Sequence, residues 1–345
     1  MILIMKAVVL ESFGDSEKAF KVKEVPQPSD ILADEVLIKV ESFGLNFADV
    51  MARRGFYNDA PELPAILGYD VVGTVLKSGS EEGDHLQGKR VVAMTRFGGY
   101  AEYVKTKISG VVEIGDQMQA YKALALATQY CTAYYACCEV TNLFSSDKIL
   151  LHAAAGGVGT AITQLAKLKG CTVYGLTSSQ EKVSYLKSNG VDFPIVSNNG
   201  EYHQQLTELL NGAKIDAVFN SVGGATYKKD FKLLDKGGRL LLYGVADRLT
   251  MRKGFLGTLN LLWKFGLMTP VQLLISSQSV TGINMLRIAD YKPQTLKRCL
   301  EKVVEMTLSN ELNPNQGGAF SVDDISKAHD LLESRKSVGK IVVNW

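Results

Sequence analysis

The pattern of apolar and polar positions divides the 345-residue chain into two parts that predict different kinds of sheet. Before residue 148, short segments rich in apolar residues are separated by Gly and Pro, at residues 5–10, 35–41, 70–75 and 89–94. Strands at this spacing are typical of a partly open antiparallel barrel. We therefore expect a β-rich domain at the N-terminus.

From residue 148 onward, apolar strands alternate with helical patterns. The expected strands are residues 148–153, 172–176, 193–196, 215–219, 239–243 and 279–283, and the expected helices are residues 157–169, 180–188, 202–210 and 225–233. This alternation predicts a doubly wound parallel sheet of the Rossmann type. Two helices, 293–308 and 322–334, and a strand, 340–343, follow, and we expect this tail to return to the first domain.

The net charge, the cysteines and the longest apolar stretch of the chain limit which partners and which cellular compartment we expect. The net charge of +2 gives no reason to expect a nucleic-acid partner. Five cysteines without C-x-x-C spacing indicate reduced thiols in the cytoplasm and argue against a zinc cage. The longest apolar stretch, residues 254–275, is interrupted by Asn260, Lys264 and the Thr269-Pro270 pair, so we expect no transmembrane segment. Contact with substrate, with a second subunit or with a membrane surface remains open for this stretch.

A glycine-rich turn follows the first strand of the expected parallel sheet. That strand runs into Gly156-Gly157-Val158-Gly159 and then into an amphipathic helix. Glycines here permit a tight bend and let backbone N–H groups approach a pyrophosphate at the helix N-terminus. Ala154 occupies the first position of the Gly-x-Gly-x-x-Gly pattern. The turn predicts dinucleotide binding, because a plain strand-to-helix turn would not need three glycines in four positions.

The residues after the second strand indicate which dinucleotide binds. An enzyme that uses NAD places Asp or Glu there, on the ribose 2′-OH. This chain has Thr177-Ser178-Ser179 and then Lys182. Hydroxyls and an ammonium suit a 2′-phosphate, so Ser178 and Lys182 predict NADPH. The alternative is that Ser178 caps the next helix and Lys182 is a solvated lysine, although capping and phosphate binding can coexist.

Several motifs together resemble a known family. They are Gly44-Leu45-Asn46-Phe47-Ala48-Asp49, Arg54-Gly55-Phe56-Tyr57, Pro64-Ala65-Ile66-Leu67-Gly68-Tyr69-Asp70-Val71-Val72-Gly73, Gly98-Gly99-Tyr100-Ala101-Glu102-Tyr103, His152-Ala153-Ala154-Ala155-Gly156-Gly157-Val158-Gly159, Ser221-Val222-Gly223-Gly224 and Gly339-Lys340-Ile341-Val342. The chain resembles the zinc-independent quinone oxidoreductases of the medium-chain dehydrogenase/reductase superfamily, which include zeta-crystallin and the enoyl reductases. Within this family the chain is most similar to the branch of synaptic vesicle amine-transport protein homologues, because it has a long apolar insert after Tyr243-Gly244.

The resemblance implies a domain plan and further site residues. The GroES-like catalytic domain would comprise residues 1–127 and 286–345. The Rossmann domain that binds NADPH would comprise residues 128–285. Asn46 is implied to lie beside the nicotinamide, and a buried amide there can donate to a developing oxyanion. Tyr57 could offer a phenolic O–H to the same oxygen. Beyond Gly156, Gly157, Val158, Gly159, Ser178 and Lys182, the implied cofactor contacts are Asn46, Thr132, Gly223, Tyr243, Gly244, Ile283, Asn284 and Arg335.

Each of these assignments has a structural alternative. Asn46 could be a turn residue that satisfies its own backbone, Tyr57 a tyrosine of the core or cleft wall, and Arg335 a helix-end arginine in water. His152, on an apolar strand, is more typical of a core histidine than of a proton donor. Asp49 is expected to anchor its loop through backbone N–H groups.

The expected chemistry needs no metal. Zinc alcohol dehydrogenases of the superfamily place a cysteine ligand where this chain has residues 46–49, and Gly-His-Glu where it has Gly68-Tyr69-Asp70. This chain has no cysteine before Cys131, so we expect no catalytic zinc. Without a Lewis acid, the site should favour acceptors that are activated by conjugation, such as quinones and α,β-unsaturated carbonyls.

Three functions remain open on the sequence. They are an NADPH-dependent quinone or enone reductase, a trans-enoyl-thioester reductase on the same fold, and a non-enzymatic nucleotide-binding protein that acts at a membrane or partner surface. The first two share their residues and differ in pocket size. Relatives often dimerise through the last strand of the Rossmann sheet, here residues 279–283, which implies a homodimer.

Overall fold

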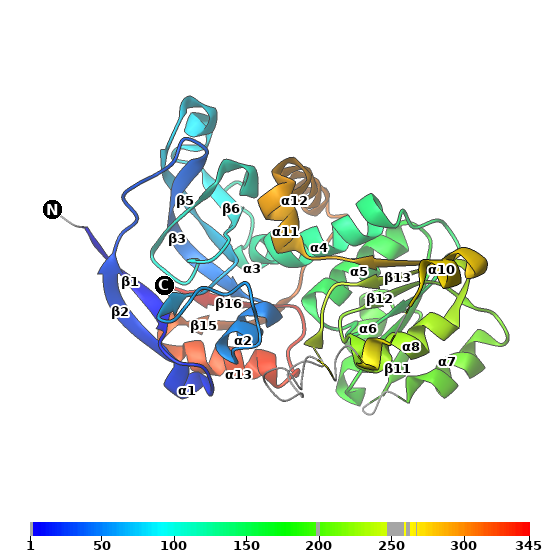
Figure 1. The fold of residues 1–345 in the computed structure, drawn as a ribbon. Helices are drawn as coiled ribbons and strands as arrows, with labels where there is room; N and C mark the ends of the chain where they lie inside the picture. Colours follow the sequence, from blue (N-terminus) through cyan, green and yellow to red (C-terminus); the bar gives the residue numbers. More distant parts are fainter. Residues whose placement is uncertain (1–2, 198–200, 247–258, 260–262, 267) are drawn as a thin grey trace. The chain divides into compact units, whose positions relative to one another are not determined.

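The computed structural model describes residues 3–197, 201–246, 259, 263–266 and 268–345 (Figure 1). The chain divides into two compact units. Unit 1 combines the chain up to Cys131 with Met285–Trp345, and unit 2 is Thr132–Asn284. The C-terminal tail thus belongs to the same unit as the N-terminal strands.

Unit 1 is built on two sheets. The larger has seven strands, in the order β15-β16-β3-β5-β6-β8 with β7 paired to β3, and the smaller has the order β2-β1-β4. All pairings are antiparallel except that of β15 with β16. The strands are β1 (Ile4–Leu10), β2 (Phe20–Pro26), β3 (Glu35–Leu45), β4 (Ala65–Ile66), β5 (Asp70–Ser78), β6 (Arg90–Met94), β7 (Tyr103–Lys107), β8 (Val111–Glu113), β15 (Gln316–Ser321) and β16 (Lys340–Asn344). Their inward apolar side chains form one core with the apolar face of helix α13.

The helices of unit 1 lie around these sheets. They are α1 (Ser16–Ala19), α2 (Phe47–Arg53), α3 (Ala120–Ala125), α11 (Met285–Tyr291), α12 (Pro293–Leu308) and α13 (Ile325–Glu333), with the 3-10 helices η1 (Glu81–Leu86), η2 (Ile108–Gly110) and η7 (Val322–Asp324) and the π-helix η3 (Leu126–Tyr130). Helix α12 begins with Pro293 and buries Leu296, Leu300, Val303 and Val304, a spacing that places them on one face. Helix α13 contacts α1 and α2 (Figure 1).

Unit 2 contains a parallel sheet of six strands in the order β11-β10-β9-β12-β13-β14. Counted from β9, this is the 3-2-1-4-5-6 order of dinucleotide-binding folds. The strands are β9 (Lys148–Leu151), β10 (Thr172–Thr177), β11 (Phe193–Val196), β12 (Ile215–Asn220), β13 (Leu234–Leu242) and β14 (Ser279–Gly282). The sequence predictions of a Rossmann-type parallel sheet and of a mostly antiparallel, β-rich unit are confirmed.

Helices connect these strands. They are α5 (Gly157–Leu168), α6 (Val183–Ser188), α7 (Tyr202–Leu210), α8 (Gly224–Leu233) and α10 (Pro270–Ser276), with α4 (Cys131–Tyr134) at the unit boundary, the π-helix η4 (Tyr135–Val140) and the 3-10 helix η5 (Gln180–Lys182). The predicted helix at 180–188 therefore begins with a 3-10 turn. Of the apolar insert 254–275, residues 254–258, 260–262 and 267 lie outside the described residues.

Candidate functional site

The residues predicted to bind the dinucleotide from unit 2 gather at one edge of its parallel sheet. They follow the carboxyl ends of five strands, with Gly156, Gly157, Val158 and Gly159 after β9, Ser178 and Lys182 after β10, Gly223 after β12, Tyr243 and Gly244 after β13, and Ile283 and Asn284 after β14. Open α/β sheets bind ligands outside the carboxyl ends of their strands. Thr132 differs, because it lies on α4 and is buried.

The glycine turn after β9 packs its helix tightly on the strand. Gly156 is the N-cap of α5, and its carbonyl oxygen accepts the Thr160 backbone N–H at 2.8 Å. A Cβ at Gly159 would lie 2.5 Å from the carbonyl oxygen of Ala153, so only glycine permits this approach. The left-handed residue of the turn is Ala153, with φ of 50°. The helix N-terminus and its N–H groups therefore stand at the edge of the sheet, where a pyrophosphate could bind.

The residues after β10 correct one detail of the sequence analysis. Ser179, not Ser178, caps the short helix η5, since its Oγ accepts the backbone N–H of Glu181 at 3.3 Å. The alternative that Ser178 is the cap is therefore wrong, and Ser178 is exposed. Lys182 is half-buried, and this burial lowers the pKa of its ammonium. The partial burial of Lys182 argues against the alternative that it is a solvated surface lysine.

A buried polar network fixes the turn after β12. Asn220 Oδ1 accepts the backbone N–H groups of Val222 at 2.8 Å and Gly223 at 2.9 Å. Its Nδ2 donates to Asp230, which also accepts from His152 Nε2 at 3.0 Å. Gly223 adopts φ of 100°, a conformation that favours glycine. His152 is thus a hydrogen-bonded core residue, as the sequence predicts, and it connects the ends of β9 and β12.

Three adjacent strands of unit 1 bring Asn46, Asp70 and Lys340 together. Asn46 follows β3, while Asp70 and Lys340 begin the antiparallel neighbours β5 and β16. Asn46 Nδ2 donates to Asp70 Oδ1 at 2.7 Å, and Lys340 Nζ donates to Asn46 Oδ1 at 3.0 Å. Lys340 also forms an ion pair with Asp70, and the Thr128 hydroxyl donates to Asp70. We call Asn46, Asp70, Thr128 and Lys340 the Asn46 cluster.

Asn46 is also the N-cap of α2. It forms a capping box with Asp49, whose Oδ2 accepts the Asn46 backbone N–H at 2.8 Å. The alternative role of Asn46 as a local turn residue is therefore present, but the side chain has distant partners as well. Asp49 anchors the loop as predicted. Burial raises the pKa of the Asp49 carboxyl to about 7.

Tyr57 lies beside a second tyrosine that the sequence analysis did not single out. The rings of Tyr57 and Tyr69 meet edge to face, with centroids 6.3 Å apart. Burial raises the pKa of the Tyr57 phenol, so this group remains a hydrogen-bond donor at neutral pH. Tyr57 is half-buried and packs against the unit 1 core, so it could be a wall residue as well as a donor.

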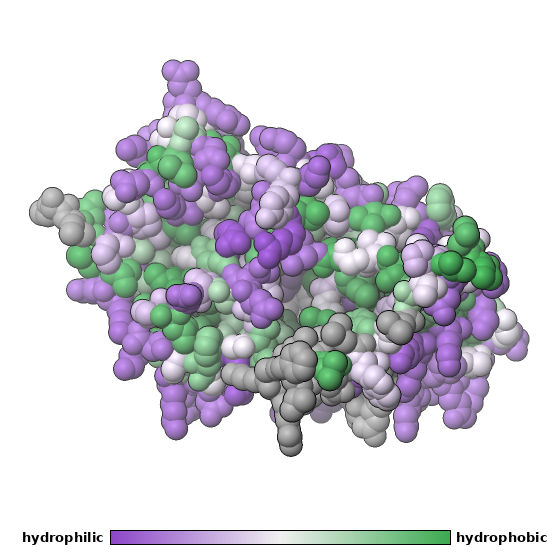
Figure 2. Space-filling view, in the orientation of Figure 1, coloured by the Kyte–Doolittle hydropathy of each residue, from purple (hydrophilic) through white to green (hydrophobic). Residues whose placement is uncertain are grey.

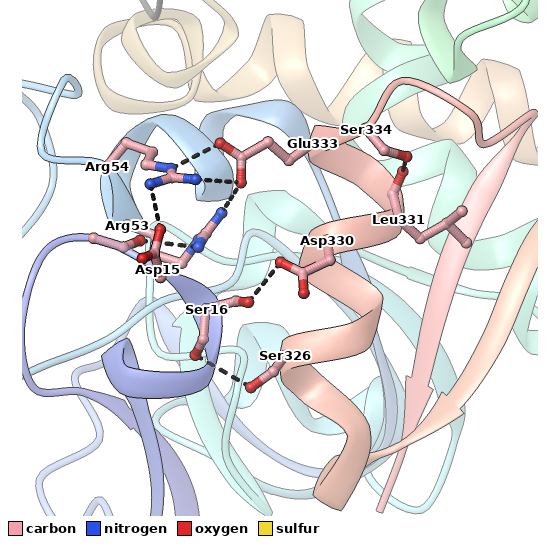
Figure 3. Close-up of polar contacts among 10 residues, drawn as sticks. Asp15, Ser16, Arg53, Arg54, Ser326, Asp330, Leu331, Glu333 and Ser334 are labelled. Carbon is pink, nitrogen blue, oxygen red and sulfur yellow. Dashed lines mark hydrogen bonds and ion pairs between the residues drawn. The ribbon is translucent and has the colours of Figure 1, made fainter.

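The end of helix α13 is fixed by two arginines (Figure 3). Arg53 is fully buried and forms an ion pair with Glu333, the last residue of α13. Arg54 Nε donates to the same carboxylate at 2.7 Å, and Arg54 Nη1 donates to Asp15 at 2.9 Å. Arg335 follows two residues later, exposed and in the left-handed region with φ of 58°. Its predicted contact with the cofactor stays a prediction.

Comparison with known proteins gives a consistent result. Residues 32–116 match the alcohol dehydrogenase GroES-like domain, and residues 157–301 match the zinc-binding dehydrogenase family. The human synaptic vesicle membrane protein VAT-1 homolog is 28% identical over 342 residues, covering 99% of this chain and 86% of the relative. VAT-1 of Tetronarce californica is 29% identical over 337 residues, covering 97% and 86%.

Solved structures agree. The human VAT-1 homolog-like protein superposes with a TM-score of 0.84 at 25% identity, covering 99% of this chain and 98% of the other. A mycobacterial protein complexed with NADPH gives a TM-score of 0.84 at 27% identity, covering 99% and 100%. This chain belongs to the quinone oxidoreductase and VAT-1-like family of medium-chain dehydrogenases/reductases. The chain is thus a member of an oxidoreductase family, and the family supports a nicotinamide cofactor.

The described residues contain no group of three or more His, Cys, Asp or Glu side chains arranged to hold a metal ion. No helix within the described ranges is long and apolar enough to cross a bilayer.

Sequence reasoning quoted Asp70 and Lys340 within motifs but gave them no role, and it did not consider Thr128. One signal was available, because Lys340 and Asp70 are charges that each begin an apolar strand. A charge in such a place needs a buried partner. Only the order of β16, β3 and β5 shows that the two charges are each other's partners.

Proposed function

We propose that this protein is an NADPH-dependent oxidoreductase that transfers hydride to a quinone or an α,β-unsaturated carbonyl without zinc. The observation that carries the proposal is the composition of the Asn46 cluster. Its carboxylate, the group that could bind a metal, is paired with the Lys340 ammonium. A metal cation there would face a buried positive charge, and the cluster offers no thiolate or imidazole ligand. The cluster instead supplies an amide donor.

The edge of the parallel sheet suits a dinucleotide phosphate. The N-terminus of α5 offers backbone N–H groups, and a Cβ at Gly244 would lie 2.7 Å from the Ser221 carbonyl oxygen, so the chain there is close-packed around glycine. Exposed Ser178 and half-buried Lys182 provide a hydroxyl and an ammonium for a 2′-phosphate. Together they support NADPH over NADH.

When bound, the nicotinamide ring supplies the hydride. An electron pair of the conjugated acceptor then moves onto its oxygen as the new C–H bond forms. We assign the Asn46 Nδ2 N–H and the Tyr57 phenol to that oxygen, as donors that stabilise its negative charge. The Tyr57 phenol, which is protonated at neutral pH, is also the group we assign to deliver the proton that completes the reduction.

The test is NADPH oxidation, followed by absorbance, with a panel of quinones, enones, enoyl thioesters and simple ketones. The proposal expects turnover of quinones or enones, no turnover of simple ketones, and no loss of activity in a chelator. Turnover of enoyl thioesters alone would favour the thioester reductase on the same site. Absence of turnover with every acceptor, together with tight NADPH binding, would favour a non-enzymatic role.

We also propose that the protein forms a homodimer through β14. This strand ends the sheet order, and α10 beside it exposes Val271, Leu274 and Ile275 on one face (Figure 2). Leu274 is 79% exposed, and such a contiguous apolar patch is unusual on a monomer. The opposite edge strand, β11, contains Pro194, which cannot donate a backbone hydrogen bond. The two edges thus differ in their capacity to pair, which favours β14.

A further inference from the structure

The amide of Asn46 lies between two partners of opposite hydrogen-bonding character. Lys340 Nζ can only donate, and it faces Asn46 Oδ1 at 3.0 Å. The Asp70 carboxylate, paired with Lys340, can only accept, and it faces Asn46 Nδ2 at 2.7 Å. Asp70 and Lys340 have no exposed surface, so water does not compete for these contacts.

These partners permit a single orientation of the amide. If the carboxamide rotated by half a turn, its NH2 group would face the ammonium and its oxygen would face the carboxylate. Both contacts would then be repulsive, and both would lie in a buried environment where such mismatches are most costly. Among the contacts of the described residues, one N–H of Nδ2 is left over for a ligand.

Gly44 provides the room for this arrangement. It lies on β3 directly opposite Asp70 of β5 and Val342 of β16. A Cβ at this position would overlap both Lys340 Cε and Asp70 Oδ2. The φ of Gly44 lies outside the left-handed region, so the backbone conformation alone does not require glycine here. The space taken by the Lys340–Asp70 ion pair does.

We propose that Lys340 and Asp70 are positioning residues that lock the Asn46 carboxamide with its free N–H as a donor in the active site. This inference rests on the proposed role of Asn46 in stabilising the substrate oxygen. Neither residue needs to touch substrate. Their charges act by excluding the orientation in which Asn46 would present its carbonyl oxygen and repel the developing negative charge.

The decisive variant is the double substitution Asp70→Asn with Lys340→Gln. It removes both charges together, so no uncompensated ion of this pair remains buried. Asn has the shape of Asp, Gln is shorter than Lys, and both amides can donate and accept. Asn46 can then adopt either orientation. We expect kcat to fall by between about 2-fold, if the orientations are equally populated, and about 100-fold, the typical cost of losing such a donor. The NADPH dissociation constant should change less than kcat does.

The control is the double substitution Arg90→Gln with Glu41→Gln. This ion pair, 2.8 Å long, also belongs to the unit 1 sheet, and the hydrogen bonds of Arg90 go to Glu41 and to the Gly115 and Met118 carbonyl oxygens, outside the Asn46 cluster. It should leave kcat unchanged. Thermal unfolding of both variants shows whether each is folded at the assay temperature.

A third measurement establishes whether Lys340 and Asp70 act through Asn46. In an Asn46→Ala background, the Asp70→Asn and Lys340→Gln pair should lower kcat no further, because there is no amide left to orient. Full additivity of the two effects would overturn the inference, as would an unchanged kcat in the charge-free variant while Asn46→Ala alone is impaired. If Asn46→Ala itself leaves kcat unchanged, the proposed role of Asn46 fails and the positioning role fails with it.

A readout without turnover tests the lock itself. In a proton–nitrogen NMR spectrum of the ligand-free protein, the side-chain NH2 signals of Asn46 are identified by their loss in Asn46→Ala. We expect two well-separated proton signals that exchange slowly with solvent in the wild type, because one proton is bonded to a buried carboxylate. In the charge-free variant, and in Gly44→Ala, the signals should converge or exchange faster. Wild-type signals that already exchange like those of an exposed asparagine would overturn the lock.

Discussion

The ammonium of Lys340 donates a hydrogen bond to the side-chain oxygen of Asn46, 3.0 Å away, although the two residues are 294 positions apart in the chain. This contact forms because β16, the last strand in the sequence, pairs with β3. It makes the C-terminal strand a part of the candidate active site. The amide of Asn46 is therefore held by the tertiary fold and not only by its own turn.

The first prediction concerns Asn46 itself. Asn46→Ala should lower kcat by about 100-fold or more, the typical cost of removing one donor to an oxyanion. The dissociation constant of NADPH should rise much less, because the phosphate contacts proposed for unit 2 remain. Steady-state kinetics with the best quinone or enone, together with a fluorescence titration of NADPH, give both numbers. An unchanged kcat on every accepted substrate would reduce Asn46 to a helix cap.

The second prediction concerns metal content. The purified protein should contain no stoichiometric zinc and should keep its activity after dialysis against a chelator. The reason is chemical, since the Asp70 carboxylate is paired with an ammonium and the Asn46 cluster has no soft ligand. Elemental analysis is the measurement, and one tightly bound zinc per chain would contradict the proposal.

Much of unit 2 could be predicted because its strands are buried on both faces. A strand such as β9, whose Ile149, Leu150 and Leu151 are buried, is a continuous apolar run that stands out in the sequence. The motif glycines then mark where the chain leaves the sheet. The positions after β9, β10, β12, β13 and β14 therefore follow from the sequence.

Elements of unit 1 were harder to predict, for reasons visible in two strands. In β2, Lys21, Lys23 and Glu24 leave little apolar signal, because the strand is mostly exposed. In β15, Gly317 and Gly318 disfavour a strand locally, and only pairing with β16 forms it. The Asn46 cluster shows the same limit, because the partner of a buried charge is set by strand order, which no local pattern reveals.

The third prediction concerns the apolar face of α10. Leu274→Lys with Ile275→Lys should shift a dimer toward monomer, because two charges would enter the proposed β14 interface. Sedimentation velocity over a range of protein concentrations measures this, with Leu308→Lys, at an exposed leucine in unit 1, as the control. If the wild type is monomeric but binds anionic liposomes, and the variant does not, the face contacts membranes instead.

The fourth prediction concerns pH and stability. Burial raises the pKa of Asp49 from 3.8 to about 7, so between these pH values the folded protein holds a proton that the unfolded chain has released. The contribution of Asp49 to stability is thus fully present below pH 3.8 and is lost as pH rises to about 7. The Asp49→Asn variant should not show this loss. The difference between its free energy of unfolding and that of the wild type should therefore increase with pH, by at most about 1.4 kcal/mol per pH unit between pH 3.8 and about 7.

Urea denaturation at several pH values measures the difference between Asp49→Asn and wild type, which cancels the contributions of other carboxyl groups. The control is Asp34→Asn. Asp34 is exposed, and its hydrogen bond to Lys107 lowers its pKa, so this variant should show no gain with rising pH. A difference for Asp49→Asn that does not vary with pH would mean that Asp49 is ionised in the folded protein.

The last prediction concerns the choice of cofactor. Ser179 caps η5. We therefore assign the proposed contacts with the 2′-phosphate to Ser178 and Lys182. A charge-assisted contact contributes roughly 1.5 to 3 kcal/mol, so Lys182→Ala should weaken NADPH by about 10-fold to 100-fold. NADH binding should hardly change, because NADH has no 2′-phosphate to lose. The loss for NADPH should also shrink as salt is raised, since Lys182 is only half-buried.

Both dissociation constants are measured by nicotinamide fluorescence, with Lys187→Ala, at an exposed lysine on α6, as the control. Equal losses for the two cofactors would mean that Lys182 supports the fold or the pyrophosphate, and that the phosphate assignment is wrong.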